Sequence, residues 1–104
     1  RANFSRARLN NCDLSESRLN EADFRQANGS GSLFIRSDLS RANLRDANFI
    51  AAILQKCVLS GADLQGANLF RADLSQSQVD QATRLEGAYT ARVKTLPRHN
   101  GKEV

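Results

Sequence analysis

One histidine, two cysteines and eleven acidic residues are the side chains of this 104-residue chain that could carry chemistry. His99 stands in a basic stretch without a cysteine or a carboxylate constellation beside it. A zinc site needs several such ligands, and a catalytic triad needs a nucleophile and an acid next to its histidine. We therefore predict neither a metal site nor a triad.

Several aspartates recur at one place in a five-residue pattern: Asp13, Asp23, Asp38, Asp63 and Asp73. They could be read as paired catalytic carboxylates or as outward side chains that hydrogen-bond locally. We favour the second reading, because the recurrence is part of the pattern itself. A closely packed repeat interior also offers no pocket for a substrate. The sequence therefore predicts a protein that is not an enzyme, without a cofactor or a small-molecule substrate.

The five-residue pattern is plainest in residues 60–75, S-GADLQ-GANLF-RADLS, where each large apolar residue (position i) follows an alanine (position i−2). The same register runs without gaps from Ala2 to Tyr89. All 18 positions i−2 hold a small residue, and 16 of the 18 positions i hold Leu, Phe, Val or Tyr, the exceptions being Gly29 and Arg84. A pattern of this length fixes the architecture.

A period of five fits neither a helix nor an uninterrupted strand. On a helix, steps of five residues scatter the apolar side chains around the cylinder, and on a strand an odd step alternates between faces. A short extended segment puts i−2 and i on one side, and a bend must follow it. Four bends of ~90° close a square coil of about 20 residues, and coils stack ~4.8 Å apart. Three bends would close a triangle instead.

The motifs ANF, CDL, ADF, SDL, ANL and ADL follow the pattern A(D/N)LXX, which resembles the pentapeptide-repeat family. The resemblance implies an all-β fold, a right-handed quadrilateral β-helix (β-solenoid) with i−2 and i inward and the other three positions outward. It implies about 4.5 coils of four repeats, followed by a C-terminal cap. We expect the β-helix over residues 1–90 and the cap with a basic, mobile tail over residues 91–104.

Cys12 and Cys57 both occupy position i−2, in different columns and two coils apart. Because ~10 Å of axial separation exceeds the reach of a disulfide, we expect both to be buried, reduced, alanine-like residues. Reduced cysteines suit a reducing compartment, so we favour the cytoplasm. The thylakoid lumen or the periplasm is the alternative if an N-terminal targeting segment has been removed.

Gly29 is an irregular core position. Stacking at 20 residues places it in a column with Leu9, Phe49, Leu69 and Tyr89. Phe49 is large enough to lean into the gap, which would make this a tolerated packing exchange. The alternative is a local bulge that shapes a binding surface.

Apolar residues also occupy outward positions, where the pattern does not require them. Five of them should form one patch, with Ile50 and Phe70 in one column and Leu33 and Ile53, with Ile35 beside them, around the corner. A contiguous patch often marks an interface. We therefore expect a protein partner or a homo-oligomer, held through this patch or through an open coil end. Aliphatic residues tolerated for their strand propensity are the alternative.

The pattern weakens after Gln76. Val79 keeps its position, Arg84 does not, and a one-residue slip would bring Leu85 inward. The ending from Thr83 to Pro97 resembles the endings of some cyanobacterial and plastid members. We expect a cap formed by four apolar residues, with Pro97 stopping further strand pairing: Leu85, Tyr89, Val93 and Leu96.

The charge argues against two further functions. Residues 1–90 carry eleven Arg or Lys against ten Asp or Glu, and residues 91–104 carry four against one. Family members that mimic DNA and modulate DNA gyrase need a strongly negative surface, so this near-neutral, short body disfavours that alternative function. Arg25 and Arg45 share one outward column and Arg36 and Lys56 another, but interleaved acids argue against nucleic acid as the partner. We also predict no membrane span, because no long apolar run exists.

Overall fold

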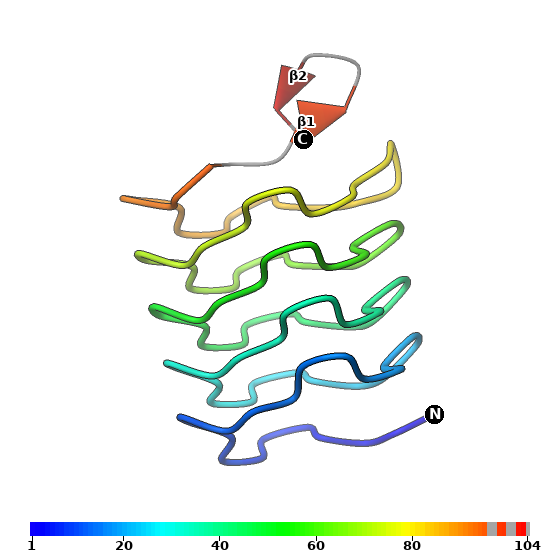
Figure 1. Ribbon diagram of the computed structural model, residues 1–104, viewed down its shortest axis with the longest axis vertical. Helices are drawn as coiled ribbons and strands as arrows, with labels where there is room; N and C mark the ends of the chain where they lie inside the picture. The colour runs from blue at the N-terminus through cyan, green and yellow to red at the C-terminus, as the bar shows by residue number, and fades with distance from the viewer. Residues whose placement is uncertain (96–97, 100–101, 104) are drawn as a thin grey trace.

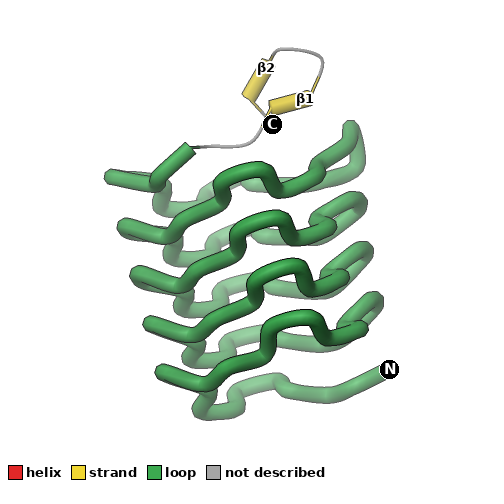
Figure 2. The backbone as a smooth tube through the Cα atoms, viewed as in Figure 1, coloured by secondary structure: helices red, strands yellow, loops and turns green. Residues whose placement is uncertain are grey.

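The computed structural model describes residues 1–95, 98–99 and 102–103 of the chain. The backbone winds into a stack of similar flattened coils, with the N-terminus at one end of the stack and the C-terminus at the other (Figure 1). Nearly all of it is drawn as loop in Figure 2, because the coils pair through single residues and not through long strands. No helix occurs among the described residues.

Parallel bridges join residues that lie one coil apart. Asn3 pairs with Asp23, Asp23 with Asn43, and the spacing of 20 residues is kept as far as the bridge between Val58 and Gln78. Backbone hydrogen bonds follow the same register, as from Phe4 N–H to the Asp23 carbonyl at 2.6 Å. The square coil of four repeats is thus confirmed, and a triangular coil is excluded.

A tight turn follows each large residue and makes the corner. At the first corner the N–H of Ala7 donates to the carbonyl of Phe4 at 3.0 Å, and Arg6 at position i+2 has φ 59°. A positive φ at the second central residue identifies a type II turn. The same geometry recurs around the stack, and fourteen of the described residues other than glycine have positive φ.

Asn and Asp at position i−1 stabilise these turns. Their Oδ1 atoms accept hydrogen bonds from the N–H two residues later, as from Arg25 to Asp23 at 3.0 Å and from Ile50 to Asn48 at 3.0 Å. An Asx side chain bonded in this way mimics a backbone turn. The recurring aspartates are therefore hydrogen-bonding residues of the turns, as the sequence predicted.

The core consists of the inward residues of the middle coils. It is buried from Leu19 to Leu74, and the rings of Phe24, Phe34 and Phe49 are fully enclosed. Phe34 contacts both other rings edge to face, with centroids 5.9 Å from Phe24 and 5.6 Å from Phe49. Edge-to-face contacts of this kind add to the stabilisation that burial gives.

Cys12 is exposed, so the prediction that both cysteines are buried was wrong for this residue. It lies in the first of the described coils, and no described coil packs against the N-terminal side of that coil. Leu9 and Leu14 of the same coil are only partly buried for the same reason. Cys57, in the third coil, is buried as expected.

One extra residue enters the pattern after Gln78. From the bridge between Asp63 and Arg84 onward, paired residues are 21 apart, so Thr83 takes position i−2 and Leu85 takes position i. The Thr83 hydroxyl donates to the Leu59 carbonyl at 2.8 Å, and the Asp80 carboxylate accepts from the N–H of Gly61 at 3.0 Å. These bonds fix the slip that the sequence suggested at Leu85.

The slip corrects the expected place of Tyr89. Tyr89 stands at position i−1, pairs with Asn68, and points outward with 55% of its surface exposed. It is therefore neither in the column of Gly29 nor part of a cap, whereas Leu85 and Val93 do pack against the core.

The last parallel bridge joins Asp73 to Lys94, so the coil pairing continues past residue 90. Strands β1 (Arg98–His99) and β2 (Lys102–Glu103) follow and pair antiparallel, within the stretch expected to be a mobile tail. Leu96 and Pro97, to which the cap prediction also refers, lie outside the described residues.

Candidate interaction surface

Two adjoining sides of the coil stack carry the outward apolar residues that the sequence singled out. We call these sides the second and the third wall and define them by the residues that each coil contributes. The second wall is 7–11, 27–31, 47–51, 67–71 and 88–92. The third wall is 12–16, 32–36, 52–56, 72–76 and 93–95. The first wall is 2–6, 22–26, 42–46, 62–66 and 83–87, and the fourth wall is 17–21, 37–41, 57–61 and 77–82.

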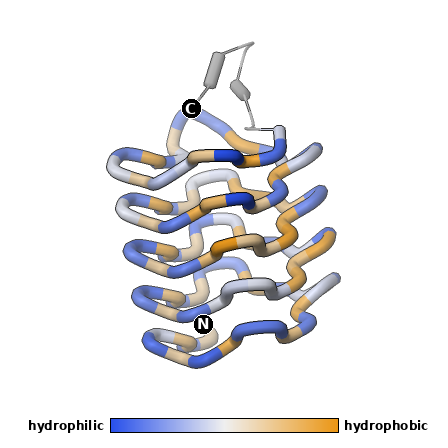
Figure 3. The backbone as a smooth tube through the Cα atoms, turned by 90° about the vertical axis from the view of Figure 1, so that its left-hand side faces the viewer, coloured by the Kyte–Doolittle hydropathy of each residue, from blue (hydrophilic) through white to orange (hydrophobic). Residues whose placement is uncertain are grey.

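The structure brings the candidate residues into two groups. On the third wall, Leu33 and Ile53 form a parallel bridge, and Ile35 follows Leu33 at the next outward position. On the second wall, Ile50 and Phe70 occupy the same position in successive coils. All five are partly buried. Figure 3 shows how hydrophobic and hydrophilic segments recur at the same places from coil to coil.

Tyr89 extends the second-wall group, which the sequence reasoning missed. Its ring stacks on that of Phe70 with centroids 5.9 Å apart and an angle of 20° between the planes. The guanidinium of Arg71 lies over the Phe70 ring, 5.4 Å from its centroid. The signal was present in the slip at Leu85, because carrying that slip forward moves Tyr89 to an outward position.

We name the resulting set the outer apolar surface. It consists of Leu33, Ile35, Ile50, Ile53, Phe70 and Tyr89.

Two acids border this surface in the third-wall column: Asp13, beside Leu33, is exposed, and Asp73, beside Ile53, is already occupied. Asp73 pairs with Ile53, is 5% exposed, and accepts hydrogen bonds from Ser75 and from Gln55 Nε2, the latter at 2.6 Å. Lys94 Nζ lies 3.8 Å from its Oδ2. Burial alone would raise the pKa of Asp73, but the hydrogen bonds from Ser75 and Gln55 and the charge of Lys94 together lower it. Asp73 therefore stays charged at neutral pH, and its charge is balanced within the fold.

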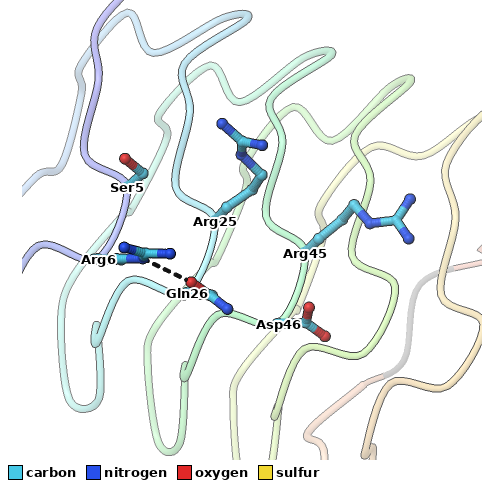
Figure 4. A pocket seen from close by; sticks show the side chains of 6 residues that line it. All are labelled: Ser5, Arg6, Arg25, Gln26, Arg45 and Asp46. Carbon is cyan, nitrogen blue, oxygen red and sulfur yellow. Dashed lines mark hydrogen bonds between the residues drawn. The ribbon is translucent and has the colours of Figure 1, made fainter.

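A shallow polar groove lies on the first wall, where Arg25 and Arg45 project from successive coils (Figure 4). Its arginines are already engaged. Arg6 Nε donates to Gln26 Oε1 at 2.9 Å, Arg25 pairs with Asp23 at 2.7 Å, and Arg45 pairs with Asp63 at 3.3 Å. Asp23 and Asp63 thus neutralise Arg25 and Arg45, the column that could have formed a basic stripe.

Within the part of the chain that the structure describes, no group of three His, Cys, Asp or Glu side chains could hold a metal ion. The buried Cys57 thiol donates to the Phe34 carbonyl at 2.6 Å, and burial raises its pKa to about 12. A thiol protonated at neutral pH is not a nucleophile. In the same part of the chain, no helix is long and apolar enough to span a bilayer.

Comparison with solved structures gives two relatives with the same stacked coils. The chain is 27% identical to HetL, a pentapeptide repeat protein involved in heterocyst differentiation regulation from the cyanobacterium Nostoc sp. strain PCC 7120. That match has a TM-score of 0.63 and covers 89% of this chain but only 46% of HetL. The chain is also 28% identical to alr5209, a pentapeptide repeat protein from Nostoc PCC 7120, with a TM-score of 0.58 and coverage of 90% and 86%. No curated protein sequence matches it.

The family profile for pentapeptide repeats matches eight copies over residues 1–41 and 42–81, which is most of the chain. The repeat pattern, the square coils and both structural relatives agree on a right-handed quadrilateral β-helix. Members of this family are generally non-catalytic. The chain belongs to the pentapeptide-repeat family.

Proposed function

We propose that the chain is a non-catalytic protein-interaction module that holds another protein against the outer apolar surface. The observation that carries this proposal is the column formed by Ile50 and Phe70, together with the exposed ring of Tyr89 that stacks on Phe70. Single exposed apolar residues are normal on any protein, but apolar residues aligned across successive coils indicate an interface.

The fold itself does not require apolar residues in this column. The two preceding coils place Asn10 and Ser30 at the positions equivalent to Ile50 and Phe70. Those polar residues occupy the same backbone geometry, so the later apolar residues are not needed to form the coil. Aromatic residues and arginine are also the types enriched where binding energy concentrates in protein interfaces.

A regulatory, non-catalytic role is in keeping with the relative HetL, which is itself involved in regulation. A gyrase-modulating DNA mimic has less support. Such a mimic needs a strongly negative surface, whereas residues 1–90 are close to neutral and the second and third walls carry Arg71 and Arg92.

The test compares captured proteins before and after the surface is made polar. The wild-type chain, an Ile50→Ser/Phe70→Ser variant and a Val58→Ser control are immobilised in parallel. Val58 is also outward and partly buried, but it lies on the fourth wall. A specific partner should be retained by the wild type and the control and lost by the double variant, and its direct binding should be verified by titration of the purified protein.

Light scattering of the same variants tests whether the partner is a second copy of the chain. Capture or self-association that persists unchanged in the double variant, provided that its circular dichroism matches the wild type, would rule out this surface as the interface.

A further inference from the structure

We propose that the segment bound by the outer apolar surface is an acidic and apolar polypeptide. Its apolar side chains would cover Ile50, Phe70 and Tyr89, and its carboxylates would pair with the arginines at the adjoining corner. This inference rests on the proposed function and specifies the chemistry of the partner.

Positive charge is concentrated on the two walls that carry the surface. From the second coil onward, these walls comprise residues 27–36, 47–56, 67–76 and 88–95. They hold five Arg or Lys against Asp73 alone, a net charge of +4. The rest of residues 1–95 holds eight Arg or Lys against nine Asp or Glu, a net charge of −1. The apolar residues therefore lie on walls that carry a net positive charge from the second coil onward.

Two of these cations stand at the corner that separates the two groups of apolar residues. Arg71 and Arg92 are both exposed, and both occupy the corner position, with φ 59° and 57°. The N–H of Arg71 donates to the carbonyl of Ala91 at 3.2 Å, which places the two corners in successive coils. Neither arginine forms an ion pair within residues 1–95.

A second pair of cations lies at the far edge of the third wall. Arg36 and Lys56 occupy the next corner, also in successive coils, since the N–H of Arg36 donates to the carbonyl of Gln55 at 2.9 Å. Neither is ion-paired among residues 1–95. Leu33, Ile35 and Ile53 thus have cations along the far edge of their wall, and Asp73, the acid on that wall from the second coil onward, is buried and balanced.

The geometry of Arg71 suits a carboxylate ligand. Its guanidinium lies over the Phe70 ring. A stacked guanidinium keeps its N–H edge available, and that edge matches a carboxylate in a two-point hydrogen bond. The stack also restricts the side chain before binding, which reduces the entropy lost on association.

Nucleic acid fits this arrangement less well. Single-stranded nucleic acid binds along a continuous basic groove with aromatic residues on which successive bases stack. Here the residues between the cations are mostly aliphatic. Among the described residues, Tyr89 is the one large apolar side chain that is exposed and could stack on a base. A phosphate backbone crossing the surface would therefore lie on side chains that cannot balance its charge.

A random-peptide library displayed on phage, panned against the intact chain, tests the proposal. We expect the selected peptides to be enriched in Asp and Glu together with Leu, Ile or Phe. Reversal of two charges in Arg71→Glu/Arg92→Glu should weaken their binding by about tenfold or more, and added salt should weaken binding to the wild type. The matched control Arg6→Glu/Arg18→Glu, which changes the same number of exposed charges outside the two walls, should bind the peptides like the wild type.

The outcomes separate this inference from the proposed function. Peptides that require Ile50 and Phe70 but carry no acidic enrichment, or that tolerate the Arg71/Arg92 reversal, would overturn the inference alone. Peptides that bind equally well to Ile50→Ser/Phe70→Ser would overturn both. Displacement of the selected peptides by a single-stranded oligonucleotide of mixed sequence, lost in the Arg71/Arg92 variant, would identify nucleic acid as the partner class and overturn the inference.

Discussion

The ring of Phe49 fills the space beside Gly29, one coil away in the same core column. A Cβ atom at Gly29 would lie 2.7 Å from Cε1 of Phe49 and 2.9 Å from its Cδ1. Phe49 is fully buried and in edge contact with Phe34, so its ring has little room to withdraw. The irregular core position is therefore a packing exchange between two coils.

Gly29→Leu should destabilise the chain by about 1–3 kcal/mol, because it overpacks a filled position. Urea denaturation followed by circular dichroism measures the change. The double variant Gly29→Leu/Phe49→Ala should recover part of the loss, since it moves the large side chain from one coil to the other. A more stable Gly29→Leu protein would mean that the position is a void.

Ala51→Gly should stabilise the chain by about 0.5–1 kcal/mol, because alanine is held in a left-handed conformation that glycine adopts without steric penalty. Ala51 is exposed at a corner with φ 58°. The matched control is Ala52→Gly, one residue later, where the methyl group is fully buried. The control should lose stability in the same urea titration, and a loss for both variants would contradict the strain argument.

Acid should weaken the turns that aspartates stabilise, and Asp38 gives the clearest test. Hydrogen bonds from the Ser40 hydroxyl and from its backbone N–H, at 2.7 and 2.9 Å, lower the pKa of Asp38 from its ordinary 3.8. A lowered pKa in the folded state contributes stability above the unfolded value, and that contribution is lost as pH falls through the folded value.

Asp38→Asn keeps an oxygen acceptor for the turn but removes the charge. We therefore expect the stability difference between wild type and variant to be largest at neutral pH and to shrink as the pH falls below 3.8. Urea midpoints measured across this range check the trend. Ser40→Ala, which removes the strongest hydrogen bond to the carboxylate, should reduce the same pH dependence, and a difference that grows in acid would contradict the assignment.

The two cysteines should differ sharply in reactivity. Cys12 is exposed, whereas burial raises the pKa of Cys57 to about 12. A thiol reagent added at pH 8 should modify one thiol promptly and the second only after denaturant is added. Cys12→Ser should abolish the prompt phase and Cys57→Ser the delayed one. Two prompt phases of equal rate would show that the core around Cys57 opens readily.

The fold could be predicted from the sequence because one local rule is repeated without a gap. In each repeat two residues, such as Ala62 and Leu64, indicate which side of the backbone faces inward, and each further repeat confirms the register. The bridge from Asn3 to Asp23 follows directly from that count.

The slip after Gln78 could be suspected but not placed with certainty. Small residues stand at both candidate registers, as Ala82 and Thr83 do. The choice depends on tertiary bonds, from Thr83 to Leu59 and from Gly61 to Asp80, that link residues about a coil apart. The exposure of Cys12 likewise depends on which coils are stacked and not on the pattern around it.

The outward apolar columns could be predicted from the sequence for the same reason as the core, because residues 20 positions apart align in successive coils. Tyr89 was missed because its column depends on the slip. The pairing state of Arg71 and Arg92 also required the folded chain, because it depends on which carboxylates are already occupied by other partners.

The bridges between successive coils fix the spacing of the outward side chains along each wall. Outward side chains recur along the stack at about 4.8 Å, one per coil. An α-helix laid along the stack repeats at about 5.4 Å, and an extended strand presents one face every ~6.6 Å. The side chains of a helix are therefore displaced from those of the wall by about 0.6 Å more with each coil, and those of a strand by about three times as much. A helix that runs with the stack therefore stays in step for about four coils, which is the span from Leu33 to Tyr89, whereas a strand is out of step after about one or two.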